Sequence, residues 1–414
     1  MNANHLRKSL TLLCPATPTT YTLELTNQCN NACECCGNVF EKSIGFLSGA
    51  EWQKLLNNLR PHTYYLRISG GEPTLHAEFR NIVQYIETLK VPFTVFSNAQ
   101  WDNPREIITL LGECSNLIGL LISLHGQNAM AHNTFTNTNS FARTVRNIRL
   151  ATQYGLPIDT NTVLTRQNWQ DVRDIVQLSR DLGARCAVFS RHYGITPSRF
   201  ELTATELVRA IREIEMLRRE GNPVKLNNGI PHCLCQSSSG SCLAGVTFCT
   251  IDPQGNVRPC NHAPLVLGNL QQESITELWC SQAAQEWRKM IPAQCLACKE
   301  FARCRGGCKA TAMQRGLEQD PLIRNPITKE PSERQNHLTI YAGLKPVPKF
   351  AIRQERFGFI LIHMKNVVPV DFKAMPILEA FDCQTNLAQI REAFGPEAVG
   401  FTIQLYQQGV IDLT

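Results

Sequence analysis

The stretch "TYTLELTNQCNNACECC" (20–36) joins a short apolar run to four cysteines within eight positions. Residues 20–25 alternate as a buried strand does, so the cysteines belong to the loop after it. Such a cluster suits a disulfide framework, a zinc site, a redox pair or an iron–sulfur cluster. Cys29, Cys33 and Cys36 have the spacing C-x3-C-x2-C. Three thiolates can hold three irons of a [4Fe–4S] cluster and leave the fourth iron open, whereas ordinary ferredoxin clusters take four cysteines.

The composition indicates a globular protein of more than one domain. The chain has 414 residues, of which 43% are hydrophobic and 18% charged. The net charge of +6 is spread along the chain, so no nucleic-acid partner is expected. No apolar run approaches the roughly 20 residues of a membrane span, and no signal peptide is evident. We therefore expect a cytoplasmic protein that binds no membrane, in which the clustered cysteines among the 18 serve metal binding or catalysis rather than disulfides.

Predicted strands alternate with predicted helices over positions 1–220. Six strands are expected at 20–25, 65–69, 93–97, 117–124, 158–164 and 184–190, and six helices at 49–59, 76–89, 103–112, 139–154, 168–182 and 203–219. This order predicts an α/β fold class, a partial (β/α)6 TIM-type barrel with parallel strands and right-handed crossovers. Loops at the carboxyl ends of such strands carry the chemistry. The cysteine loop follows the first strand and "GGEP" (70–73) the second, so both lie at that end.

The cysteine spacing after a first strand resembles the radical S-adenosylmethionine (SAM) superfamily. "SGGEP" (69–73) matches the family segment that receives the SAM amino group. "FSNA" (96–99), "ISLHG" (122–126) and "NTVLTRQN" (161–168) match later strand ends that contact SAM. The resemblance implies a [4Fe–4S] cluster whose open iron chelates SAM and which, when reduced, releases a 5′-deoxyadenosyl radical.

The resemblance also implies roles for individual residues. The cluster ligands are Cys29, Cys33 and Cys36, while Cys35 is expected to fill space beside the last ligand as a small hydrophobe. The expected SAM contacts are Gly70, Gly71, Glu72, Pro73, Ser97, Ser123 and Asn161. The residue that acts on the radical intermediate is not predicted.

A second group of cysteines lies between 233 and 308. Cys242, Gly255 and Cys260 form C-x12-G-x4-C, and a run C-x2-C-x5-C-x3-C follows at Cys295, Cys298, Cys304 and Cys308. Together these resemble the SPASM extension, which binds auxiliary [4Fe–4S] clusters in peptide-modifying radical SAM enzymes. Zinc is the rival occupant of four such cysteines.

The SPASM resemblance implies two ligand sets. The first is Cys242, Cys260 and Cys308 with Cys235 or, alternatively, Cys233; the second is Cys295, Cys298 and Cys304. The family places one more cysteine at the positions that correspond to 323–328 here, but none occurs between 308 and 383. The last ligand of the second set therefore stays open: an open iron, a non-cysteine ligand, Cys249, Cys280, or the spare member of the 233/235 pair.

The C-terminal residues 350–414 resemble a PqqD-like winged helix that binds leader peptides. Five Lys/Arg against seven Asp/Glu oppose a DNA-binding role. Such a domain holds a leader by adding it as a strand to an open sheet edge, and Phe359 and Leu361 are expected near the docking groove. The predicted domains are a radical SAM core (1–220), an auxiliary iron–sulfur domain (221–310), a linker (311–349) and this module (350–414).

These resemblances imply a radical SAM enzyme that modifies a ribosomally made precursor peptide. The reaction is a crosslink, an epimerisation or the excision of a tyramine unit, as in cyanobacterial spliceases. An external electron donor such as flavodoxin or ferredoxin is expected to reduce the cluster. One alternative is a sulfatase-maturase-type oxidase, although Asn261 stands where that group carries a catalytic Asp. Another is a non-catalytic iron–sulfur scaffold that recruits peptide.

Overall fold

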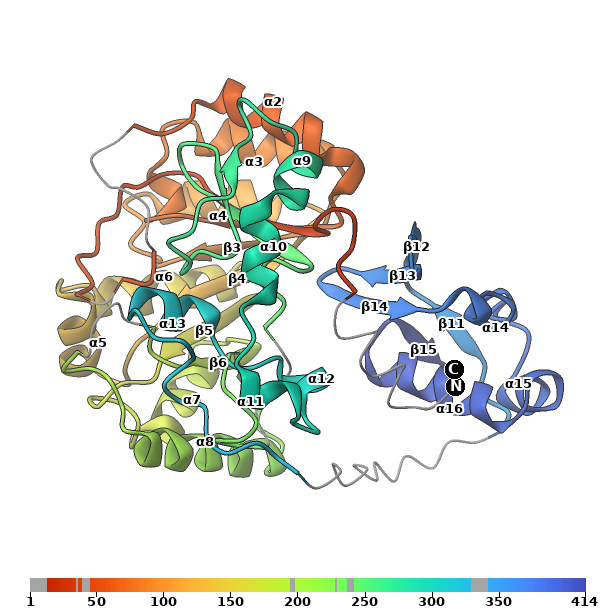
Figure 1. The fold of residues 1–414 in the computed structure, drawn as a ribbon. Coiled ribbons are helices and arrows are strands. Elements are labelled where there is room, and N and C mark those ends of the chain that lie inside the picture. Colours follow the sequence, from red (N-terminus) through yellow and green to blue (C-terminus); the bar gives the residue numbers. More distant parts are fainter. Residues whose placement is uncertain are drawn as a thin grey trace.

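A ten-stranded sheet forms the centre of the protein in the computed structural model, which describes residues 13–34, 36–38, 45–193, 198–227, 229–236, 242–328 and 342–414 (Figure 1). The strand order is β10-β9-β8-β1-β2-β3-β4-β5-β6-β7, and each pair from β8 through β1 to β7 is parallel. The strands are β1 (Thr20–Glu24), β2 (Tyr65–Ser69), β3 (Phe93–Ser97), β4 (Leu117–Ser123), β5 (Ile158–Val163), β6 (Cys186–Ser190), β7 (Val224–Leu226), β8 (Phe248–Ile251), β9 (Asn256–Arg258) and β10 (Gly268–Asn269). This sheet confirms the predicted partial barrel, with a seventh strand, β7, beyond the six predicted.

Amphipathic helices connect the parallel strands. They are α2 (Gly49–Leu59), α3 (Phe79–Thr88), α4 (Pro104–Gly112), α5 (Ala129–Thr136), α6 (Phe141–Gln153), α7 (Val172–Asp181) and α8 (Ala204–Arg219), with short 3-10 turns η1 (Arg60–His62) and η2 (Pro73–Leu75). Capping boxes start α2 at Ser48 and α8 at Thr203, where the cap hydroxyl and a glutamate three residues later satisfy free backbone N–H groups. The sequence did not predict α5, whose apolar face is narrow.

The auxiliary region begins inside the barrel sheet, because β8 pairs with β1. A hairpin joins β8 to β9, and Gly255 at its turn has a φ of 85°, which favours glycine. Short helices follow: α9 (Ile275–Cys280), α10 (Gln282–Lys289), α11 (Ala293–Leu296), α12 (Phe301–Cys304) and α13 (Lys309–Gln314). The predicted linker needs correction at both ends. Residues 311–328 fold onto the cysteine region, and 346–348 form a strand of the C-terminal unit. The prolines and charges of this segment are typical of a linker, but Asp320 among them is buried.

Residues 342–414 form a small α+β unit beside the barrel (Figure 1). Its elements are β11 (Pro346–Pro348), β12 (Ala351–Glu355), β13 (Gly358–His363), β14 (Asn366–Val370), η3 (Phe372–Ala374), α14 (Met375–Glu379), α15 (Leu387–Phe394), α16 (Pro396–Gln407) and β15 (Ile411–Leu413). Strands β12, β13 and β14 make an antiparallel sheet, and β11 pairs with β15. Leu361, expected near a groove, is fully buried in this unit's core, whereas Phe359 is only partly buried.

The C-terminal unit contacts the barrel at the end opposite the cysteine loop. The Ala16 N–H donates to the carboxylate of Glu355 over 2.9 Å, and the Arg353 guanidinium donates to the carbonyl of Thr17 over 2.9 Å. Residues 16 and 17 precede β1, so these contacts lie at its amino end. Within the ranges above, no helix has the length and apolar character that crossing a membrane requires.

Candidate active site

The cysteine loop and the glycine segment are locked together by backbone hydrogen bonds. The Gly71 N–H donates to the carbonyl of Thr26 over 2.8 Å, and the Glu72 N–H donates to the carbonyl of Gln28 over 2.7 Å. These acceptors lie just before Cys29. The two motifs are far apart in the chain, yet they form one structural unit at the carboxyl ends of β1 and β2.

The two glycines of this unit cannot carry side chains. Gly70 has a φ of 138°, and a Cβ at that position would lie 2.6 Å from the carbonyl oxygen of Thr26. A Cβ at Gly71 would lie 2.1 Å from the carbonyl oxygen of Gln28. Close passage of the cysteine loop, rather than turn geometry alone, explains both glycines.

The three predicted cluster cysteines occupy an accessible loop. Cys29 and Cys36 are exposed and Cys33 is half-buried. The Cys29 sulfur accepts from the Asn31 N–H at 3.4 Å and from the Asn98 side-chain amide at 3.7 Å. Cys35 lies outside the described residues, so its predicted packing role stays a prediction. Accessible thiols that accept hydrogen bonds suit ligands of a cluster that a small cofactor must reach.

Glu72 joins the ends of β2 and β3. Its buried carboxylate accepts from the Ser97 hydroxyl at 2.8 Å, the Asn98 N–H at 2.7 Å and the Thr74 hydroxyl at 2.7 Å. The Ser97 oxygen also accepts from the indole N–H of Trp101 at 2.9 Å. Burial raises the pKa of the Glu72 carboxyl, and these hydrogen bonds oppose that shift. Both side chains are thus occupied within the protein, and they hold the loop around the predicted cofactor position.

We expect Glu72→Gln to destabilise the protein although it preserves the shape of the side chain. The new amide would point N–H groups at donors that now meet a carboxylate, leaving buried groups unsatisfied at a cost of about 1–3 kcal/mol. Urea unfolding of the apo protein measures the effect. Glu113→Gln, at an exposed glutamate after α4, is the matched control and should change little. Equal unfolding midpoints for both variants would contradict this role of Glu72.

Ser123 and Asn161 lie side by side at the carboxyl ends of β4 and β5, where they are register partners. Both are half-buried, on the strand face opposite the fully buried residues. The Asn161 amide oxygen accepts from the Ser190 hydroxyl at 2.9 Å, and the Asn227 amide donates to the same hydroxyl at 3.1 Å. A polar row therefore runs from Ser123 on β4 across β5 and β6 to the end of β7, at the predicted cofactor end of the barrel.

A first cysteine pocket lies in the auxiliary region. Cys242, Cys260 and Cys308 line a hollow of about 550 Å³, which is also lined by Arg305 and Arg288. Burial raises the pKa of Cys242 to about 11, and the neighbouring Cys308 thiol adds a smaller contribution in the same direction. The Cys308 sulfur accepts from the backbone N–H and the hydroxyl of Thr311, at 3.4 and 3.3 Å.

A second pocket of about 330 Å³ contains four cysteines: Cys233, Cys295, Cys298 and Cys304. Burial raises the pKa of Cys295 to about 12, and the nearby thiols of the other three add to that shift. His232 also lines this pocket, and its Nδ1 lies 2.8 Å from the carboxylate of Glu300.

Other cysteines considered for these sets lie elsewhere. Cys235, predicted for the first set, lines neither pocket and packs against the apolar core that holds Leu164 and Phe189. Cys249 is fully buried within the barrel core, and Cys280 is exposed at the end of α9. The structure therefore groups three predicted thiols in one pocket and three others with Cys233 in the next.

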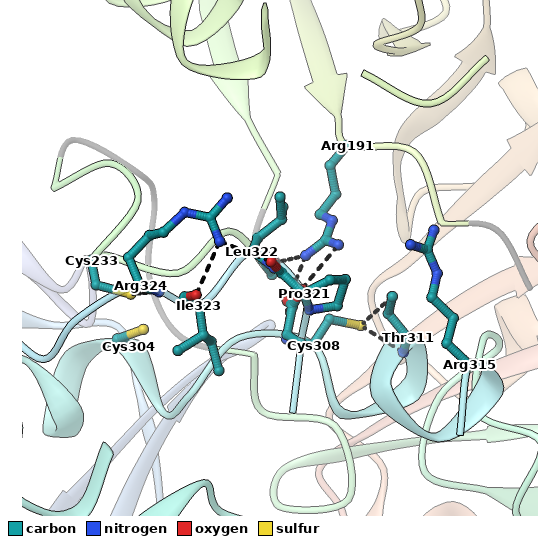
Figure 2. A network of polar contacts seen from close by, with 12 residues as sticks. Arg191, Cys233, Cys304, Cys308, Thr311, Arg315, Pro321, Leu322, Ile323 and Arg324 are labelled. Carbon is teal, nitrogen blue, oxygen red and sulfur yellow. Dashed lines mark hydrogen bonds and ion pairs between the residues drawn. The ribbon is translucent and has the colours of Figure 1, made fainter. Parts of the chain in front are cut away.

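A buried ion pair connects the barrel to both pockets. Arg191, just after β6, donates to the carboxylate of Asp320 at 2.6 and 3.2 Å, with side chains 4% and 0% exposed. Asp320 also accepts from the Cys308 N–H at 2.7 Å. Figure 2 shows Arg191 reaching the segment 321–324, which lies between Cys308 and Cys233. Sequence reasoning missed this pair because its members are 129 residues apart and belong to no motif.

Asp320→Ala should destabilise the protein by about 3–5 kcal/mol, because the Arg191 charge would stay buried without its partner. Chemical unfolding of the apo protein measures this free energy, and iron content after reconstitution shows whether Cys308 stays positioned. Asp102→Ala removes an exposed ion pair with Arg143, whose members are 77% and 46% exposed, and should cost at most about 1 kcal/mol. Similar losses in both variants would contradict an anchoring role for Asp320.

His262 connects the cysteine loop to the first pocket. Its Nδ1 donates to the carbonyl of Gly37 at 2.8 Å, and its ring stacks on Tyr193 with centroids 4.5 Å apart. Burial lowers the pKa of His262 to about 4, so the ring is neutral near pH 7. A Cβ on Gly37 would lie 2.3 Å from this ring, which explains the glycine directly after Cys36. No sequence motif signals this contact.

The donor sets of the two pockets fit iron–sulfur clusters. In the first pocket, buried nitrogens of Arg288 and Arg305 have no hydrogen-bond partner among the described residues, so they offer donors to an anionic group. In the second, the buried Nε2 of His232 likewise has none. In the described ranges no three His, Cys, Asp or Glu side chains are placed to hold a single metal ion. Thiolates with surrounding hydrogen-bond donors are the ligands of iron–sulfur clusters.

Two family models match the chain. Residues 23–179 match the radical SAM superfamily, and residues 242–305 match SPASM, the iron–sulfur cluster-binding domain. The first range contains the loop of Cys29, Cys33 and Cys36. The second contains Cys242 and Cys260 of the first pocket and Cys295, Cys298 and Cys304 of the second.

Two curated proteins and one solved structure are similar to this chain over most of its length. It is 28% identical over 321 residues to the mycofactocin maturase MftC of Mycobacterium ulcerans (strain Agy99), covering 73% of this chain and 86% of that protein. It is 23% identical over 335 residues to the AdoMet-dependent heme synthase of Methanosarcina barkeri (strain Fusaro / DSM 804), covering 72% and 94%. The fold is similar to that of Streptococcus suis SuiB bound to its precursor peptide SuiA, with a TM-score of 0.63 and 16% identity over 77% of this chain and 79% of that one.

Proposed function

We propose that the chain is a radical SAM enzyme with a SPASM domain that modifies a ribosomally synthesised precursor peptide, because residues 23–179 match the radical SAM superfamily and residues 242–305 match SPASM. The observation that carries the proposal is the unit formed by the cysteine loop and Gly70–Gly71, at the active end of the barrel. Two auxiliary pockets in the range that matches SPASM support it, and so does the similarity of the chain, along 73% of its length, to a protein named as a maturase, MftC.

The SAM-binding cluster is assigned to Cys29, Cys33 and Cys36. Backbone groups of residues 70–73 and the polar row that includes Ser123 and Asn161 are assigned to SAM. A [4Fe–4S] cluster held there would supply the electron for reductive cleavage of SAM and so the radical chemistry that removes a hydrogen atom from the peptide. The protein's own part is to position this cofactor: Glu72 fixes the loop ends, and the glycines allow close approach of the backbone.

The auxiliary clusters are assigned to the two cysteine pockets. Arg288 and Arg305 line the first pocket, each has one buried nitrogen without a partner among the described residues, and their guanidinium groups would stabilise an anionic cluster. An external donor such as flavodoxin or ferredoxin would supply electrons. Crosslinking, epimerisation and tyramine excision all begin with hydrogen abstraction, so the site alone does not select one of them.

Residues 342–414 are assigned to the leader of the precursor. Among the described residues no strand pairs with the outer edge of β14, whereas β12 lies against residues 16 and 17 through Arg353 and Glu355. An extended leader can therefore add as a strand to β14. Phe372, 46% exposed just after β14, offers an apolar contact, with its ring centroid 5.2 Å from that of Phe359.

Anaerobically reconstituted protein tests the proposal directly. With SAM and dithionite it should form 5′-deoxyadenosine, and a small peptide encoded beside the gene should change mass when coexpressed. Iron-replete protein that forms no 5′-deoxyadenosine would instead support a non-catalytic scaffold. Oxidation of a sulfatase serine or cysteine without any effect on such peptides would support the sulfatase-maturase alternative.

A further inference from the structure

The second pocket contains a sulfur that the SPASM pattern does not supply. That pattern places its last cysteine at the positions that correspond to 323–328 in this chain. The sequence there is "IRNPIT", without a cysteine. The segment nevertheless reaches the pocket, because Ile323, Arg324 and Pro326 line it.

The segment contributes hydrogen-bond donors in place of a thiolate. The Arg324 N–H donates to the Cys233 sulfur at 3.1 Å, and the Ile327 N–H donates to the Cys298 sulfur at 3.4 Å. From the loop after β7, the His232 N–H donates to the Cys304 sulfur at 3.3 Å. Three of the four thiols in this pocket therefore accept a backbone N–H, an arrangement that stabilises cluster-bound thiolates.

We propose that Cys233 is the fourth thiolate ligand of the second auxiliary [4Fe–4S] cluster and replaces the absent downstream cysteine. It completes the set of Cys295, Cys298 and Cys304. This inference rests on the proposed presence of iron–sulfur clusters in the pockets. The segment 320–327 keeps its place at the cluster because Asp320 anchors it to Arg191, as described above.

The other cysteines considered as this ligand lie outside the second pocket. Cys249 is fully enclosed by barrel side chains. Cys280 is exposed on α9, outside the pocket. Cys235, only two residues from Cys233, packs towards the barrel core. The loop after β7 thus directs one of its two cysteines to the cluster and the other away from it.

The test uses full-length protein in which Cys29, Cys33 and Cys36 are all alanine, so that bound iron reports only the auxiliary pockets. After reconstitution this background should hold about eight irons, as two cubes require. Adding Cys233→Ala should remove up to about four of them, or leave a cluster that gives the EPR signal of a three-iron species after oxidation. Cys298→Ala should behave in the same way, and the exposed Cys280→Ala is the control that keeps all the iron.

Pairs of substitutions assign Cys233 to one pocket. Cys233→Ala with Cys298→Ala should lose no more than one cube, about four irons. Cys233→Ala with Cys242→Ala should lose iron from both pockets. Unchanged iron and EPR spectra in Cys233→Ala would overturn the inference, and so would loss of both cubes in the Cys233/Cys298 pair. A background that binds no iron at all would instead refute the auxiliary clusters themselves.

Discussion

Cys33→Ala should abolish formation of 5′-deoxyadenosine from SAM while the protein stays folded. The cysteine loop supplies three thiolates, so each loss removes one ligand from the cluster that must leave an open iron for SAM. Cys33 is half-buried on a loop fixed by backbone bonds between residues 26–28 and 71–72, and its methylene contributes little to the core. We expect activity at the background level in anaerobic assays with SAM and dithionite.

Iron analysis separates this effect from general damage. The fully reconstituted enzyme should hold about twelve irons, and replacing all three loop cysteines should leave about eight in the auxiliary pockets. Cys114→Ala is a matched control, because this half-buried thiol lies after α4 and donates to the carbonyl of Leu110 at 3.3 Å, far from the loop in sequence. The assignment fails if Cys33→Ala still cleaves SAM, or if Cys114→Ala loses activity equally.

The barrel was predictable because its strands are short apolar or alternating runs that amphipathic segments separate. All six strands predicted between positions 1 and 220 occur within one or two residues of their expected ends. The linker prediction failed for 311–328, where Asp320 and Arg315 look like solvent-facing residues. In the structure Asp320 pairs with Arg191, and Arg315 donates to Glu201 at 2.8 Å. A buried charge and an exposed charge look alike until the partner is known.

The radical SAM and SPASM resemblances, read from cysteine spacing, are confirmed by the family models. Cysteine spacing predicts the ligands of a cluster when they lie on one loop, because they must then follow each other closely in sequence. It does not predict ligands from distant segments that only the tertiary structure brings together. Cys233 lies far before Cys298 along the chain, and only the packing of 323–327 against both shows that they share a pocket. Similarly, the contact between His262 and Gly37 spans 225 residues.

The leader site proposed on the C-terminal unit would lie away from the proposed site of SAM cleavage. Its contacts with residues 16 and 17 lie at the amino end of β1, whereas the cysteine loop leaves the carboxyl end. The five residues of β1 separate the two by about 17 Å. A leader bound at β14 must therefore be followed by an extended spacer that carries the reactive residue to the barrel mouth.

Deleting residues 342–414 should leave SAM cleavage nearly intact and lower peptide modification by about 10²–10⁴-fold, the gain that tethering provides. Phe372→Asp should reproduce part of this loss, since it places a charge at the apolar end of the free β14 edge. Phe394→Asp, at a 40% exposed phenylalanine on α15, is the matched control and should leave modification unchanged. Mass spectrometry of the coexpressed precursor measures product, and 5′-deoxyadenosine formation without peptide measures the activity of the barrel alone.

A truncated enzyme that modifies its precursor at the full rate would show that the leader binds elsewhere. A loss of both activities would show that the unit instead supports the barrel through Arg353 and Glu355.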